Sequence, residues 1–153
     1  MRVCRPKLPF SICQIGKAFR NEITPGNFIF RTREFEQMEC EVFCYPDEAD
    51  KEFDKQLKKI KHLLKDVYQR KESNWRLFEH PKDDLSHYSK RKIDIQYKFP
   101  AGYFELWGLA NRQDFDLASH DKASKAGLLY MDDTGKKLIP YVIEPSVVVE
   151  RLF

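Results

Sequence analysis

Four charged residues around one predicted turn are those best suited to chemistry. Arg20 and Glu22 come just before the turn-forming residues 24–27, and Arg31 and Arg33 follow them. If the flanking segments pair as a hairpin, three arginines lie close together, and clustered guanidinium groups favour a multiply charged anion such as a polyphosphate. Ordinary surface ion pairs would explain the same residues, so the spacing leaves both interpretations open.

A second candidate group consists of carboxylates on predicted strands. Glu39 and Glu41 point the same way, which suits capture of an ammonium group or acid–base work, although a solvated sheet face has the same pattern. Glu105 stands in a stretch otherwise fit for burial, 103–107. A buried carboxylate needs a partner or a ligand, so this position remains open between the two.

Metal ligation and the common phosphate-binding motifs find little support. Asp114, Asp116 and His120 are metal-ligating residue types, but no third strong ligand falls at a convincing spacing, so we expect no protein-bound structural metal. The sequence contains no glycine-rich phosphate loop, no Ser-centred nucleophile elbow and no His-Glu-x-x-His motif. If the chain handles a nucleotide, it must use arginines instead of a backbone cradle.

The elements that must position these residues are predicted from periodicity. Residues 36–44 alternate as a strand, and with the segment 12–19 they predict an antiparallel pair; 28–30 looks like a resumed strand. Residues 47–71 predict an amphipathic helix with one apolar face, formed by Phe53, Leu57, Ile60, Leu64 and Val67. Further strands are expected at 93–97, 103–110 and 138–143, and a buried helix from 147. The predicted fold class is α+β, an antiparallel sheet flanked by helices.

Composition and charge limit the classes of protein to which the chain can belong. The 153 residues are 42% hydrophobic and 33% charged, which predicts one soluble globular domain. No apolar run approaches the ~20 residues of a membrane span, and no apolar signal segment follows the N-terminus, so we expect a cytoplasmic location and no membrane partner. The net charge of +3 is too small to indicate nucleic-acid binding by itself. Four cysteines, Cys4, Cys13, Cys40 and Cys44, are expected to be reduced; the last three sit among apolar residues like small core hydrophobes.

Three stretches, in order, resemble a known family. Residues 19–22 followed by 31–35 resemble motif 2 of class II aminoacyl-tRNA synthetases, and 14–39 as a whole resembles the homodimeric glycyl-tRNA synthetases. Residues 105–112 with 114–117 are similar to that family's strand before motif 3, and 141–151 to motif 3 itself. The resemblance implies a single partial catalytic domain over 1–153, with motif 2 at about 14–39, a helical insertion at about 47–71 and motif 3 at about 141–153, cut short.

The resemblance implies ATP-dependent activation of glycine to glycyl-adenylate and its transfer to tRNA(Gly), as a ligase of protein synthesis. Arg20 would hold the α-phosphate and the amino-acid carboxylate, and Arg151 would clamp the γ-phosphate, which makes these two the catalytic residues. Glu105 would bind ATP through bridging Mg²⁺, which makes it the metal site that the resemblance implies. The ATP-binding set implied is Arg20, Asn21, Glu22, Phe30, Arg31, Thr32, Arg33, Glu34, Phe35, Glu105, Leu106, Val148, Val149, Glu150 and Arg151.

Glycine has no side chain to grip, so the resemblance implies recognition of its ammonium group by Glu39 and Glu144, with Ser146 against the α-carbon. The full glycine-binding set implied is Phe35, Glu36, Gln37, Met38, Glu39, Glu144, Pro145, Ser146, Val147 and Val148. The partners implied are tRNA(Gly), glycine, ATP and, in the full-length enzyme, a second copy as a homodimer. No general-base side chain is required.

Departures from the family leave rival interpretations. Val148 stands where the family has glycine, and its side chain would block a close backbone approach to substrate there. Motif 1, an upstream carboxylate of the glycine pocket and the anticodon-binding domain are also missing, so we expect the isolated fragment to be weak or inactive. A non-catalytic synthetase-like nucleotide-binding module is the alternative. A class II synthetase for another amino acid is disfavoured by residues 36–39 and 144–146.

Overall fold

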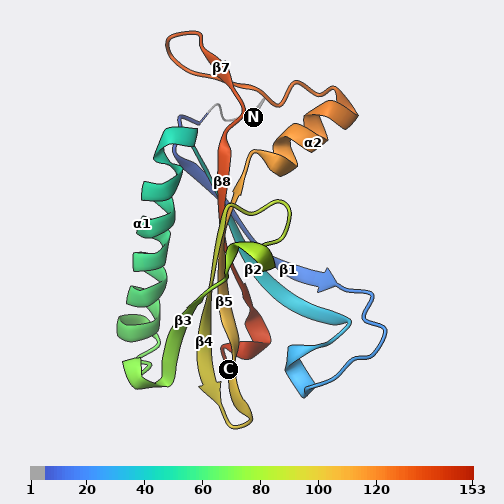
Figure 1. Ribbon diagram of the computed structural model, residues 1–153, viewed down its shortest axis with the longest axis vertical. Helices are drawn as coiled ribbons and strands as arrows, with labels where there is room; N and C mark the ends of the chain where they lie inside the picture. Colours follow the sequence, from blue (N-terminus) through green and yellow to red (C-terminus); the bar gives the residue numbers. More distant parts are fainter. Residues whose placement is uncertain (1–5) are drawn as a thin grey trace.

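A six-stranded antiparallel sheet is the centre of the computed structural model, which describes residues 6–153 (Figure 1). The strand order is β1-β2-β8-β5-β4-β3, so the strands that contain the candidate carboxylates lie side by side in the middle. The strands are β1 (Phe10–Phe19), β2 (Glu34–Cys44), β3 (Trp75–Glu79), β4 (Arg91–Phe99), β5 (Gly102–Gln113) and β8 (Tyr141–Val148). The predicted α+β class and the antiparallel pairing of 12–19 with 36–44 are confirmed.

Helix α1 (Ala49–His62) covers one face of this sheet and seals the core (Figure 1). Phe53, Ile60 and Leu64 are buried against β2, β4, β5 and β8, as their periodicity predicts. The prediction for Val67 was wrong, because its side chain is 58% exposed. The helix ends in a π-helical turn (Leu63–Val67), in which the Tyr68 amide donates to the Leu63 carbonyl five residues back. The extra residue in that turn rotates Val67 away from the sheet.

Two further predictions of local structure were wrong. Residues Phe28–Phe30 form a 3₁₀ turn instead of a strand, and Asn27 and Phe28 before and within it adopt positive φ. Val147 and Val148 complete strand β8 instead of starting a helix; only Val149–Arg151 turns, as 3₁₀. Val147 is paired on both sides, with Met38 and Trp107, and a β-branched residue between two strands suits the sheet.

The remaining elements lie at the ends of the sheet. Helix α2 (Phe115–Ser124) follows β5, and a small hairpin of β6 (Tyr130–Met131) and β7 (Lys137–Leu138) precedes β8. The strand predicted at 138–143 is therefore divided between β7 and β8. Strand β3 at the edge had no clear period in the sequence, and two of its apolar side chains, Leu77 and Phe78, are exposed.

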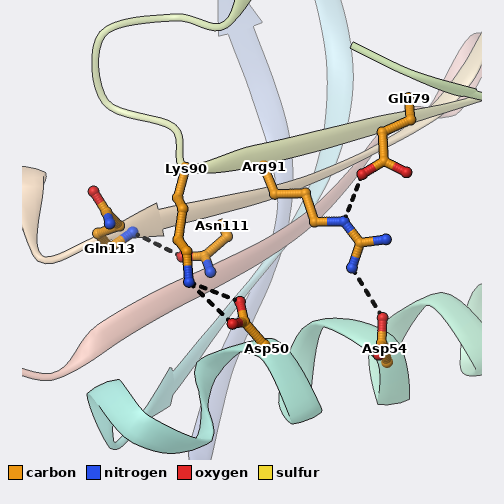
Figure 2. A network of polar contacts seen from close by, with 7 residues as sticks. All are labelled: Asp50, Asp54, Glu79, Lys90, Arg91, Asn111 and Gln113. Carbon is orange, nitrogen blue, oxygen red and sulfur yellow. Dashed lines mark hydrogen bonds and ion pairs between the residues drawn. The ribbon is translucent and has the colours of Figure 1, made fainter. Parts of the chain in front are cut away.

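An ion-pair network fixes the start of β4 to α1 and β3 (Figure 2). Arg91 donates to Glu79 at 2.7 Å and to Asp54 at 3.0 Å, and Lys90 contacts Asp50 at 3.0 Å. The Arg91 guanidinium also lies 4.5 Å from the ring centroid of Phe53 in the core. The loop that leads into β4 is thereby held in one position, and that loop delivers Tyr88 to the open face of the sheet.

Within residues 6–153, no helix is both long and apolar enough to cross a membrane.

Candidate active site

The sheet face opposite α1 carries a row of aligned residues on four neighbouring strands. Glu39 of β2 is paired with Ser146 of β8, Ser146 with Gly108 of β5, and Gly108 with Asp94 of β4. Directly opposed residues of antiparallel strands point to the same side, so these positions share one face. A cavity of about 470 Å³ lies over the row, lined by Arg20, Gln37, Glu39, Tyr88, Lys92, Glu105, Gly108, Leu109, Ala110, Arg112, Glu144 and Ser146.

A β-bulge brings Glu105 into this cavity. The β4–β5 register shifts between Ile95 and Gln96, so that Leu106 is the extra residue of β5. Strict alternation would place Glu105 on the α1 side with Trp107, but the bulge turns it to the face of Gly108. A Cβ built on Gly108 would lie 3.3 Å from Oε1 of Glu105 and 3.4 Å from Oγ of Ser146. The absence of a side chain at Gly108 therefore keeps the floor of the cavity open.

Glu144 and Arg112 form the charged end of the cavity. Nη1 of Arg112 lies 2.7 Å from Oε2 of Glu144, and its Nε and Nη2 donate to the two oxygens of Asp116 at 2.7 and 3.0 Å. The ring of Tyr88 lies under the guanidinium at 4.2 Å. Hydrogen bonds to Asp116 are the largest cause of the raised pKa of Arg112, and the same bonds lower the pKa of Asp116. Burial nevertheless raises the pKa of Glu144, since it outweighs the attraction of Arg112.

Glu41 lines a second cavity of about 410 Å³ that shares Glu39, Arg112 and Glu144 with the first. Burial, followed by the charge of Glu144, raises the pKa of Glu41 to about 7. Three glutamates thus face a common space with one nearby guanidinium. Such a site attracts a small cation, because a bound ammonium would relieve the repulsion among the carboxylates.

The arginines line a narrower cavity next to the first, with about 10 Å³ of free space. Its lining consists of Arg20, Glu22, Ile29, Phe30, Arg31, Thr32, Phe35, Val148 and Arg151. The Arg20 guanidinium lies 5.1 Å from the ring centroid of the buried Phe35, and Arg31 approaches Glu22 at 3.6 Å. Arg20 also lines the larger cavity, so it connects the two spaces.

Arg151 is held by backbone carbonyls at the edge of this narrow cavity. Nη1 donates to the carbonyl of Glu105 at 2.8 Å and Nη2 to that of Phe30 at 3.2 Å. Burial lowers the pKa of Arg151, and the charge of Arg20 acts in the same direction. The contact to Glu105 links the 3₁₀ turn after β8 directly to the bulged strand.

Not every predicted site residue faces these cavities. The Arg33 guanidinium donates to the carbonyls of Glu22 and Ile23, so of the predicted cluster only Arg20 and Arg31 line the narrow cavity. The third arginine of that cavity is Arg151, from the other end of the sequence. Glu34 forms an exposed ion pair with Lys17. Several other predicted residues lie elsewhere. Met38, Val147 and Leu106 pack in or against the core on the opposite face of the sheet, and Pro145 is buried. Asn21, Glu36, Val149 and Glu150 line neither the narrow cavity nor the cavity over Gly108. The Glu150 carboxylate accepts from the Glu36 amide at 2.8 Å.

Sequence analysis assigned no role, from residue type and spacing, to four cavity residues that matter for the site: Tyr88, Lys92, Gly108 and Arg112. Lys92 and Tyr88 come from a region without a recognisable motif, and Arg112 occupies a second bulge of β5. Gly108 is the one with a usable signal, because glycine inside a strand often marks a close approach of backbone or ligand. Asp116 and His120 lie one helical turn apart on α2, and Asp116 is hydrogen-bonded to Arg112. Residues 6–153 contain no group of three or more side chains arranged so that they could hold a metal ion.

Comparison with known proteins identifies the architecture. The family model of the tRNA synthetase class II core domain (G, H, P, S and T) matches residues 2–153. The chain belongs to this family. In fold it is similar to the prolyl-tRNA synthetase of Giardia lamblia solved with prolyl-adenylate, with a TM-score of 0.73 at 16% identity over 95% of this chain and 27% of that one.

The resemblance to glycyl-tRNA synthetases is also confirmed at the level of sequence. The chain is 56% identical over 152 residues to the glycine–tRNA ligase of Malacoplasma penetrans, which covers 99% of this chain and 33% of that protein. It is 54% identical over 152 residues to the enzyme of Caldanaerobacter subterraneus subsp. tengcongensis, with the same 99% and 33% covered. The class II core described here thus spans about a third of the length of these relatives.

Proposed function

We propose that the full-length protein activates glycine with ATP to glycyl-adenylate and transfers the glycyl group to tRNA(Gly). The observation that carries this proposal is the arrangement of Glu39, Glu41 and Glu144 around a common space beside Arg20. An amino acid without a side chain offers only its ammonium and carboxylate groups. The three carboxylates match the first group and the Arg20 guanidinium matches the second.

The chemistry follows from where the cations lie. Attack of the glycine carboxylate on the α-phosphate develops negative charge on the phosphoryl oxygens, and a guanidinium positioned there stabilises that charge in the transition state. Arg20 borders both cavities, so it suits contact with the carboxylate and the phosphate together. Arg31 and Arg151, which also line the narrow cavity, suit the outer phosphates of ATP. No side chain need form a covalent bond with the substrate.

Glu105 is the residue that would hold magnesium together with the substrate phosphates. Glu105 lines the cavity as a carboxylate donor, and Mg²⁺ is commonly held by one or two carboxylates plus substrate phosphates. When bound, the ion would neutralise phosphate charge; the chain's own contribution is to hold Glu105 on the open face through the bulge at Leu106.

Selection for glycine is attributed to the limited space above the floor at Gly108. The side chains of Glu105 and Ser146 lie so near this position that a Cβ on Gly108 would be 3.3 and 3.4 Å from them. A substrate side chain would compete with these two side chains for space or separate the ammonium from Glu39 and Glu144. By similarity to its relatives, we further propose tRNA(Gly) as partner, a homodimer and a cytoplasmic location for the full-length protein.

The test is glycine-dependent ATP–pyrophosphate exchange by the full-length protein. Glu39→Gln keeps the shape and removes the charge, so we expect KM for glycine to rise about tenfold or more with little change in ATP affinity. The exposed Glu72→Gln serves as control. Equal losses for both ligands would assign Glu39 a structural role. Wild-type protein that binds ATP without any exchange would favour the non-catalytic nucleotide-binding module, for which Val148 in the narrow cavity is the supporting observation.

A further inference from the structure

Two cysteines lie directly opposite one another on adjacent strands, on the face away from the glutamates. Cys13 of β1 is the register partner of Cys40 of β2. Opposed residues of an antiparallel pair have Cα atoms about 4.5–5.5 Å apart and side chains on the same side of the sheet. That separation falls within the range of about 4.4–6.8 Å found for disulfide-bonded cysteines. The backbone therefore already has the spacing that a bond between these residues requires.

The two thiols differ in their access to solvent. Cys13 is exposed, whereas Cys40 is partly buried against the core and Cys44 is fully buried. This corrects the expectation that Cys13 behaves as a core residue; among the described residues, β1 is an edge strand that pairs with β2 alone. Cys4 lies outside the described residues. Burial raises the pKa of Cys40 to about 11, and a hydrogen bond with the Cys13 thiol contributes to the rise.

We propose that Cys13 and Cys40 form a site of reversible oxidation, at which a low-molecular-weight disulfide converts the two thiols to an intramolecular disulfide. The exposed Cys13 thiolate attacks one sulfur of the small disulfide, whose S–S bond breaks, and one small thiol leaves. The Cys40 thiolate then attacks the Cys13 sulfur, forms the Cys13–Cys40 bond and releases the second small thiol. Two protein thiols are oxidised and one small disulfide is reduced to two thiols.

The position of this pair connects it to the arginine cavity. The chain between Cys13 and Cys40 includes Arg20, Glu22, Arg31 and Phe35, all of which line that cavity. A covalent link across β1 and β2 closes this segment into a loop and removes conformations from the unfolded or opened chain. Oxidation thus fastens β1, which in the described part of the chain is otherwise joined to the sheet through β2 alone.

The experiment is peptide mapping by mass spectrometry of the folded full-length protein after incubation with oxidised glutathione and alkylation of free thiols. We expect the peptide containing Cys13 to be joined to the peptide 34–51, with the loss of two hydrogen atoms, and dithiothreitol to separate them. That second peptide contains both Cys40 and Cys44. Cys44→Ser therefore serves as the matched variant that must keep the link, while Cys40→Ser and Cys13→Ser must each lose it.

The result that overturns the proposal is equally specific. A glutathione adduct that persists on Cys13 without resolution by Cys40 shows that the two sulfurs do not meet. A link from Cys13 to Cys44, to Cys4 or to a second molecule shows that the site is a different one. These outcomes do not depend on glycine or ATP, so they leave the proposed enzymatic function untouched.

Discussion

The guanidinium of Arg112 joins the carboxylates of Glu144 and Asp116, with its Nη1 2.7 Å from Oε2 of Glu144, while Tyr88 supports its flat face. Arg112 is thus the countercharge that opposes the effect of burial on Glu144. Without it, the pKa of Glu144 would rise further, and the protonated acid could not attract an ammonium group.

We therefore expect Arg112→Met to raise KM for glycine severalfold at pH 7, because loss of the countercharge raises the pKa of Glu144 further and leaves less of it ionised. The effect on KM should become smaller as pH increases. Glu144 with a raised pKa regains its negative charge at higher pH, and the protein then regains its affinity for glycine. KM measured by pyrophosphate exchange from pH 6 to 9 tests this, with the exposed Arg76→Met as control. A loss independent of pH would contradict the role given to Arg112.

Val148→Gly should enlarge the narrow cavity, whose free space is about 10 Å³, because the valine side chain forms part of its lining. We expect ATP affinity to increase by roughly 1–2 kcal/mol, or about tenfold, measured by calorimetry. The same change should cost about 1 kcal/mol of folding stability, since glycine inside a strand is unfavourable. Val42→Ala, on the α1 side of β2, should lose stability without gaining affinity. Unchanged ATP binding in Val148→Gly would mean that the valine does not limit access.

Glu41 makes the free energy of unfolding depend on pH. Its pKa of about 7 in the folded protein lies above the ordinary value of 4.5, so the folded state binds a proton more tightly than the unfolded chain. Stability attributable to this group is therefore full below about pH 4.5 and falls as pH rises through 7. Glu41→Gln should remove that fall and be about 1–2 kcal/mol more stable than wild type at pH 8, allowing for solvent screening. Urea titrations at pH 5 and pH 8 measure it. The exposed Glu72→Gln is the control, and its stability should change with pH as that of the wild type does. The same pH dependence in Glu41→Gln would refute the assignment.

Gly108→Ala places a methyl group 3.3 Å from Glu105 and 3.4 Å from Ser146. Folding should change little, by about 1 kcal/mol or less, because both neighbours are side-chain tips and alanine suits a strand better than glycine. Glycine activation should fall about tenfold, since the side chain of Glu105 must move by a few tenths of an ångström inside the cavity. The comparison of thermal melts with exchange rates separates the two quantities. Comparable losses of thermal stability and of exchange rate would indicate that Gly108 has a packing role only.

Much of the fold was predictable because its determinants are local. The spacing of Phe53, Ile60 and Leu64 predicted α1. The two-residue period of the segment 36–44, with Val42 and Cys44 on one face, predicted β2 and its buried face. The strands 93–97 and 103–110 were likewise confirmed as parts of β4 and β5.

The features that the sequence did not reveal arise where one extra residue interrupts the regular period of a helix or a strand. The π-helical turn displaced Val67, and the bulge at Leu106 changed the face of Glu105; each adds one residue to a period that pattern analysis takes as constant. Likewise, Cys13 is apolar in context but lies on the outermost strand, and strand order is a property of the whole sheet. The residues suited to glycine and ATP were selected by resemblance, and their charges and spacing alone left a solvated surface as an equal interpretation.

Strand β8 has neighbours on both sides, with β2 and β5 paired to its two edges. Glu144 and Ser146 point to the cavity, while Ile143 and Val147 point to α1. Gain or loss of a single codon within this strand would exchange the two sets, burying carboxylate and hydroxyl under the helix and exposing the aliphatic side chains. Evolution can therefore vary the residues of β8 one at a time but not its length, whereas the loop between β6 and β7, joined to one small hairpin, is free to grow or shrink.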